Sequence, residues 1–133
     1  MLVGSDVAGL TTTATKSPDG KSYILNGEKK WVTQGRWADV GLIAARTGPP
    51  TAKGISVFIV PLNTKGISRR KMENSGVSSS GKTRPVHCSI FKQLIMSSIG
   101  STFMELDEVI VPAENMLGRE NQGFEIIMSS IPT

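Results

Sequence analysis

The sequence has little of the chemistry that builds a disulfide or a metal site. It contains one cysteine, Cys88, beside its one histidine, His87. A single thiol cannot form an internal disulfide, and two adjacent ligands are too few for a structural zinc. No apolar run approaches the ~20 residues that span a bilayer, and the first residues show no basic leader followed by an apolar segment. We therefore predict no metal, no membrane span and no targeting peptide, and we assign no compartment.

Aromatic side chains are also scarce, with two tryptophans and one tyrosine among 133 residues. The formal net charge of +4 comes from basic residues that are scattered along the chain. A nucleic-acid surface normally combines clustered cations with aromatic rings, so no nucleic-acid partner is expected. With 38% hydrophobic and 20% charged residues, the composition is that of an ordinary globular domain.

The first part of the chain reads as short strands joined by turns. Residues 11–15 are rich in β-branched side chains, and Pro18-Asp19-Gly20 supplies the geometry of a tight reversal. Residues 23–25 then lead into Asn26-Gly27, the strongest two-residue hairpin signal. The sequence therefore predicts a second hairpin there, with residues 28–33 as its return strand.

The remaining pattern is also mainly β. Two nearly continuous apolar runs are typical of strands covered on both faces, and Gly and Pro between them indicate a loop. The runs are residues 40–45 and 55–60, further strands are expected at 67–71 and 103–111, and an amphipathic helix is expected from 121 to 130. We predict a compact antiparallel β-barrel or sandwich, followed by the start of a C-terminal helix.

Several blocks of the sequence resemble the middle domain of the acyl-CoA dehydrogenase family. Residues 4–9 (GSDVAG) and 25–33 (LNGEKKWVT) resemble the opening of that domain. The other matching blocks follow in the family's order: residues 44–47 (AART), 54–60 (GISVFIV), 64–67 (TKGI), 106–118 (LDEVIVPAENMLG) and 123–124 (GF). The resemblance implies residues 1–120 as the middle β-domain and residues 121–133 as the truncated start of a C-terminal helical domain.

The resemblance implies FAD as cofactor and an acyl-CoA thioester as substrate. By analogy, Trp31, Val32 and Thr33 would lie along the flavin ring, with the indole packed on it and the Thr33 hydroxyl near its reactive edge. Ser5 would touch both FAD and the acyl-CoA. Without the family pattern, Trp31 would be read as a core residue and Thr33 as an ordinary strand residue. The parent enzyme would be a homodimer or homotetramer.

No catalytic residue is assigned, because the glutamate base of this family normally lies in the C-terminal helical domain. The glutamates of the second half are interpreted as solvated charges: Glu105, Glu108, Glu114, Glu120 and Glu125. The chain alone is therefore expected to supply contacts rather than catalysis. Two alternatives stay open: an acyl-CoA oxidase-like or other related flavoenzyme, and a non-catalytic product of a faulty gene model.

The sequence departs from the family in three places. Only Met1-Leu2-Val3 precedes the first matching block, where the family has a further flavin-contacting segment, and Gln34 stands where asparagine is common. Residues 82–100 form an atypical insertion of 19 residues whose removal lowers the net charge from +4 to +1. We hypothesise that this segment is a translated intron; the alternative is a genuine insertion in a surface loop, which costs little closure entropy.

Overall fold

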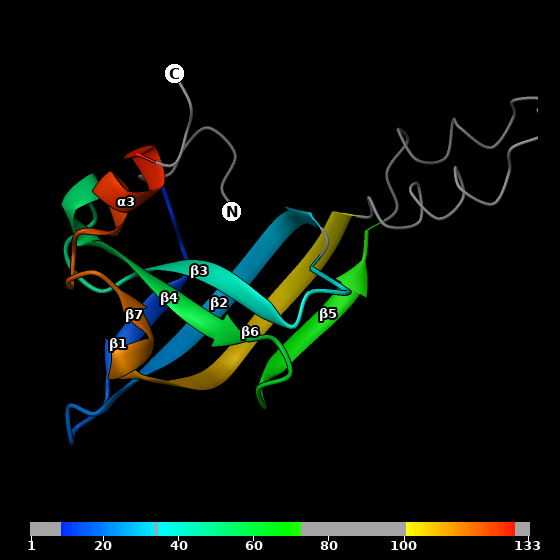
Figure 1. The fold of residues 1–133 in the computed structure, drawn as a ribbon, viewed down its shortest axis with the longest axis horizontal. Helices are drawn as coiled ribbons and strands as arrows, with labels where there is room; N and C mark the ends of the chain where they lie inside the picture. Colours follow the sequence, from blue (N-terminus) through cyan, green and yellow to red (C-terminus); the bar gives the residue numbers. More distant parts are fainter. Residues whose placement is uncertain (1–8, 34, 73–100, 130–133) are drawn as a thin grey trace, which may run out of the picture.

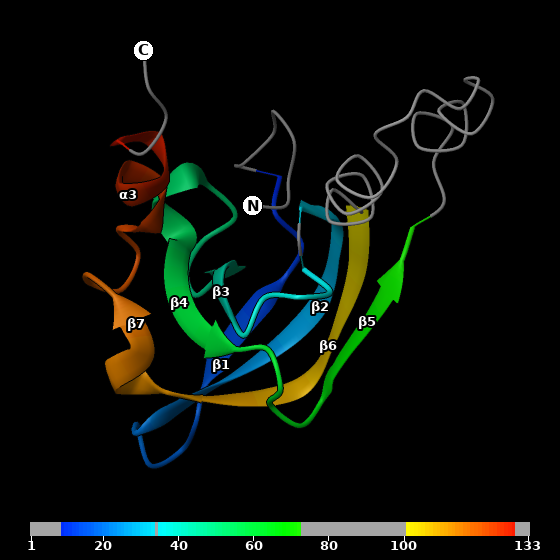
Figure 2. The same cartoon turned by 45° about the vertical axis from the view of Figure 1, so that its right-hand side comes forward.

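A computed structural model describes residues 9–33, 35–72 and 101–129 of the chain. Within these ranges the protein is mainly β, with one seven-stranded sheet in the order β5-β6-β2-β1-β3-β4-β7 (Figure 1). The sheet curls so that β5 and β7 stand at its two ends (Figure 2). The predicted mainly β fold with a C-terminal helix is thus confirmed.

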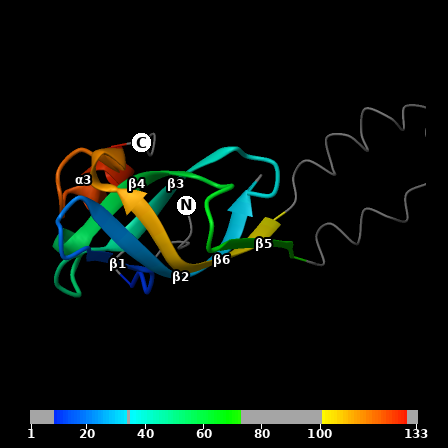
Figure 3. The same cartoon turned by 90° about the horizontal axis from the view of Figure 1, so that it is seen from below.

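The strands follow the chain as β1 (Thr13–Lys16), β2 (Ser22–Thr33), β3 (Val40–Arg46), β4 (Ile55–Pro61), β5 (Ile67–Lys71), β6 (Ser101–Pro112) and β7 (Met116–Leu117). Two short 3-10 turns, η1 (Ala52–Gly54) and η3 (Ala113–Asn115), and one helix, α3 (Gly123–Ser129), complete the described elements. The two longest strands, β2 and β6, lie side by side through the middle of the sheet (Figure 3). All pairs are antiparallel except β1 with β3, which is parallel and departs from the predicted antiparallel arrangement.

The predicted reversal at Pro18-Asp19-Gly20 is confirmed as the connection between β1 and β2. Gly20 has a φ of +71° and its N–H donates to the Ser17 carbonyl over 2.9 Å. The Asp19 carboxylate accepts hydrogen bonds from the Ser17 hydroxyl and the Lys21 N–H. These donors stabilise the charged form, so they lower the pKa of Asp19.

The predicted hairpin at Asn26-Gly27 is wrong, because β2 runs straight through both residues. The pairing of β2 with β6 shifts here, from Leu25 opposite Val109 to Gly27 opposite Leu106, so β6 carries an extra residue. Gly27 has a φ of +138°, and a Cβ there would lie 2.8 Å from the Cα of Thr12. The glycine therefore serves a bulge and a close strand contact instead of a turn.

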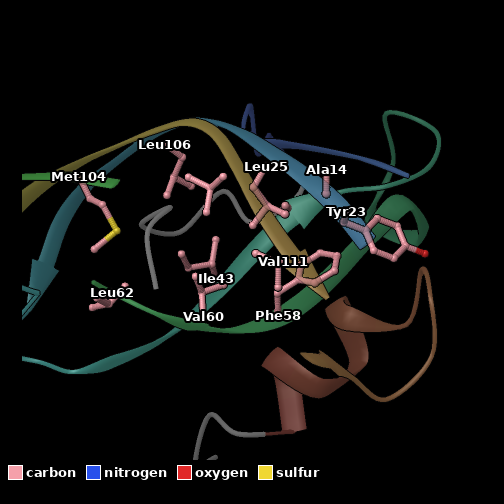
Figure 4. Close-up of a cluster of buried hydrophobic side chains, with 12 residues drawn as sticks. Ala14, Tyr23, Leu25, Ile43, Phe58, Val60, Leu62, Met104, Leu106 and Val111 are labelled. Atoms are coloured by element: carbon pink, nitrogen blue, oxygen red, sulfur yellow. The ribbon is translucent and has the colours of Figure 1, made fainter. Parts of the chain in front are cut away.

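The core lies inside the curl of the sheet, where side chains from most strands meet (Figure 4). Tyr23 and Phe58 pack with ring centroids 5.2 Å apart and planes tilted by 55°. The expectation that the two apolar strands are covered on both faces is only half right. Leu42 of β3 is 57% exposed and its partner Ile59 of β4 is 38% exposed. Only the inner face of this pair is buried.

The helix α3 packs beside β4, where Gly123 allows a close approach. A Cβ at this position would lie 2.8 Å from the Ile55 carbonyl oxygen. No helix among the described residues is long and apolar enough to cross a membrane.

Candidate functional site

A bulge in β2 presents the indole of Trp31 to the outside. The pairing moves from Lys29 opposite Met104 to Val32 opposite Thr102, so β2 has one residue more than β6 across this step. Trp31 takes a positive φ of 62° and is 56% exposed. A bulge of this kind redirects a side chain and is frequent beside functional sites. The usual core interpretation of a strand tryptophan is therefore wrong for Trp31.

The bulge also restores the inward direction for the next residue, Val32, which packs against the core. The chain then turns back sharply: Gly35 is buried, and its N–H donates to the Val32 carbonyl over 3.4 Å. A Cβ at Gly35 would lie 2.7 Å from Val32 Cγ1, so the turn leaves no room for a side chain. Val32 therefore anchors the end of β2 to the core, between Trp31 and Thr33, the other two predicted flavin contacts on this strand.

The other predicted contacts are located less fully. The backbone of Thr33 pairs with Ser101 at the end of β6, in line with Trp31 and Val32 on one strand. Ser5, the predicted contact to both cofactor and substrate, lies outside the described residues. The role of all four residues in cofactor binding remains a prediction, as does the division of the chain at residue 120. The hypothesised intron at 82–100 also falls outside the described ranges.

Next to the bulge, β2 carries a buried cation that the sequence interpretation missed. Lys29 is completely buried, and its Nζ donates to the carbonyl oxygen of Ala44 on β3 over 2.7 Å. Burial penalises the charged form and lowers the pKa of Lys29 to about 7. The alternation of buried Tyr23, Leu25 and Lys29 along β2 was a usable signal for this position.

The hydrogen bond of Lys29 lies just beyond the point where the pairing of β1 with β3 ends. Arg46 of β3 donates its N–H to the Thr12 carbonyl over 2.8 Å, so the edge of β3 that carries this group faces the β1 segment. Groups two residues apart in a strand face the same edge, which places the Ala44 carbonyl on it too. The Lys29 ammonium thus supplies a donor to that carbonyl and ties β2 to β3.

Arg46 holds the β3–β4 loop in a similar way. Its Nε donates to the Leu10 carbonyl over 3.2 Å, and its Nη1 donates to the carbonyls of Pro49 and Thr51 over 2.7 and 3.1 Å. Part of the positive charge of this protein is therefore directed at its own main chain.

The outer face beside Trp31 is lined by cations stacked on a ring. Phe103 of β6 is nearly buried, with the Arg70 guanidinium 4.1 Å and the Lys30 ammonium 5.8 Å from its centroid. Glu28 and Glu105, which pair with each other one row away, are exposed. The strand surface next to Trp31 is thus of mixed charge.

The described residues contain no group of three or more metal-ligating side chains. The glutamates that were interpreted as solvated charges are all exposed: Glu105, Glu108, Glu114, Glu120 and Glu125. Fold and site together define a mainly β domain with a curled sheet and an outward-facing tryptophan on a bulge.

Comparison with known proteins identifies the family. Residues 2–89 match the model of the acyl-CoA dehydrogenase middle domain, so the chain belongs to the acyl-CoA dehydrogenase family. It is 45% identical over 128 residues to the acyl-CoA dehydrogenase apdG of Emericella nidulans, and the match covers 96% of this chain and 25% of that protein. The chain therefore spans about a quarter of the length of this relative.

Solved structures agree with this assignment. Butyryl-CoA dehydrogenase from Megasphaera elsdenii is similar with a TM-score of 0.75 and 32% identity, over 96% of this chain and 28% of that chain. The prolyl acyl carrier protein oxidase AnaB is similar with a TM-score of 0.72 and 30% identity, over 93% of this chain and 28% of that chain. The predicted family and fold are both confirmed.

Proposed function

We propose that this chain forms part of the FAD and acyl-CoA site of a flavin-dependent acyl-CoA dehydrogenase. Trp31, Val32 and Thr33 would hold the isoalloxazine, and Ser5 would contact both FAD and the thioester. When bound, FAD supplies the hydride acceptor for α,β-dehydrogenation of the thioester. No residue of this chain is proposed as the base that removes the α-proton.

The observation that carries the proposal is the outward position of Trp31. A 56% exposed indole offers an apolar face on which a flat ring system packs, and covering it removes apolar surface from water. The positive φ of Trp31 is a strained conformation for a bulky residue. Such strain at an exposed aromatic side chain supports a binding role over a packing role.

The neighbouring residues suit this role in two ways. Val32 packs into the core and so keeps the strand end in place. The Thr33 hydroxyl would donate a hydrogen bond to the flavin edge, where a donor stabilises negative charge that develops on reduction. Such a bond is stronger where the bound ligand excludes water.

A related oxidase is the second candidate, because the prolyl acyl carrier protein oxidase AnaB shares this fold at 30% identity. Both candidates use the same flavin contacts and differ in the electron acceptor or the carrier of the acyl group. Turnover of the full-length parent with oxygen alone would favour the oxidase. We expect the parent to act as a homodimer or homotetramer.

Titration of the chain with FAD tests the proposal. We expect a dissociation constant in the micromolar range, weakened at least tenfold by Trp31→Leu and by Thr33→Val. Trp37→Leu and Thr15→Val are the matched controls, since they alter the same residue types at exposed positions, Trp37 in the turn after β2 and Thr15 on β1. Absence of FAD binding, or equal binding by all four variants, would refute the proposed site.

A further inference from the structure

The turn that follows the proposed flavin-contacting segment is held by a single arginine. Nη1 of Arg69 donates to three carbonyl oxygens: Gly35 over 3.1 Å, Arg36 over 3.4 Å and Ala38 over 3.1 Å. These acceptors lie in the connection between β2 and β3, whereas Arg69 lies on β5. The contact thus joins segments that are more than thirty residues apart in sequence.

The position of Arg69 in the sheet explains how it reaches the turn. Arg69 pairs with Met104 on β6, and Met104 pairs with Lys29 on β2, so the three residues form one row across three strands. Met104 and Lys29 are buried and Arg69 is half-buried. The row therefore carries two basic side chains that donate to main-chain carbonyls: Lys29 to Ala44 of β3, and Arg69 to the turn after β2.

A guanidinium suits this task better than other side chains. Several carbonyls that converge on one point repel each other, and a cation that is always protonated neutralises this repulsion. Hydrogen bonds to a charged donor are also stronger than neutral ones. Loss of Arg69 would leave three carbonyls of one turn without this donor.

We propose that Arg69 is a positioning residue of the flavin site: it fixes the turn at residues 35–38 and thereby the bulged end of β2 that presents Trp31 and Thr33. The link to flavin rests on the proposed function. The three hydrogen bonds from Arg69 to the carbonyls of residues 35, 36 and 38, here called the clamp, lie within this chain. Arg69 would touch neither cofactor nor substrate. Its effect would pass through the main chain that follows Val32.

Of the two tryptophans of the chain, Trp31 precedes the clamped turn and Trp37 lies within it, so the state of the turn can be measured by fluorescence. In a Trp37→Phe background, the fluorescence of Trp31 alone reports on the strand end. Arg69→Ala is expected to raise the acrylamide quenching constant of Trp31 at least 1.5-fold and to weaken FAD binding at least tenfold, with far-UV circular dichroism unchanged. Arg69→Lys, which keeps a cation, should recover part of both effects.

Lys71→Ala is the matched control, because it removes the same charge from an exposed position of the same strand. It should change both values by less than 1.5-fold. Quenching is measured without flavin, so an unaltered chain that fails to bind FAD would refute the proposed function alone. If Arg69→Ala leaves the Trp31 quenching constant unchanged, the clamp is refuted. If the unaltered chain binds FAD and Arg69→Ala binds it equally well, the role of Arg69 in the flavin site is refuted.

Discussion

The buried ammonium of Lys29 predicts an unusual dependence of stability on pH. Its pKa is lowered to about 7 in the folded protein and is about 10.4 in an unfolded chain. Between these values the unfolded state binds the extra proton, so the free energy of unfolding rises with pH. The cost of burying the charge is fully present below pH 7 and disappears above the unfolded pKa.

The size of the effect follows from the two pKa values. From pH 7 to pH 9, Lys29 should add about 2 kcal/mol to the free energy of unfolding, an order-of-magnitude figure from proton linkage. Lys29→Met keeps an unbranched apolar chain but removes the titrating group. It also leaves the Ala44 carbonyl without its donor, which costs about 1–3 kcal/mol, but that loss does not vary with pH.

Urea unfolding at pH 6, 7, 8 and 9, followed by circular dichroism, measures this dependence. The unaltered chain should gain stability relative to Lys29→Met as the pH rises. Lys65→Met, at an exposed position, should follow the unaltered chain at every pH. Parallel pH profiles for the unaltered chain and Lys29→Met would refute the assignment of a depressed pKa to this buried lysine.

Five further variants, two of them controls, test the fold. Gly27→Ala should lower the free energy of unfolding by about 2 kcal/mol or more, because a Cβ would clash with the main chain of Thr12 at a φ of +138°. Gly20→Asn, in an open turn, should lower it by less than about 1 kcal/mol in the same urea assay. Leu25→Ala should cost about 3 kcal/mol since it empties core volume, and Leu42→Ala, at an exposed position, about 0.5 kcal/mol; equal losses would contradict the core. Deletion of residues 82–100 shortens the connection between the paired ends of β5 and β6 from 30 to 11 residues. The lower entropy cost of closing this connection should raise the free energy of unfolding by about 0.9 kcal/mol. Loss of the β signal in circular dichroism would instead show that the segment is a required element.

Five of the seven strands were predictable from local signals, whereas β2 was expected as a hairpin and β7 was not predicted. Alternating or continuous apolar residues identified β3, β4 and β6 to within a few residues, and β5, whose one apolar residue is Ile67, was expected at the bounds observed. The reversal at Pro18-Asp19-Gly20 was also local, since its side-chain and backbone hydrogen bonds lie within the turn. For these elements, neighbours in sequence decide the structure.

Asn26-Gly27 shows where local signals fail. The pair tolerates positive φ, and a two-residue hairpin would use that property. Here the same property is used by a bulge in a long strand, with the Asn26 side chain accepting a hydrogen bond from the Glu108 N–H over 2.8 Å. The choice depends on β6, which is about eighty residues away in sequence, and no local pattern contains that information.

The residues of the candidate site were named from the family resemblance, and their role in flavin binding stays a prediction; the geometry of the bulge was not predicted. The family resemblance selected Trp31, Val32 and Thr33, whereas the extra residue that turns the indole outward arises only from pairing with β6. The partners of Lys29 and Arg69 are carbonyl oxygens, which every residue carries. A sequence therefore does not reveal which carbonyl a buried cation will find.

Nuclear Overhauser contacts between bound FAD and the indole rings would test the central claim directly. The account predicts contacts from the isoalloxazine protons to the ring protons of Trp31, with none of comparable strength to Trp37. FAD that binds without any contact to Trp31 would contradict the account.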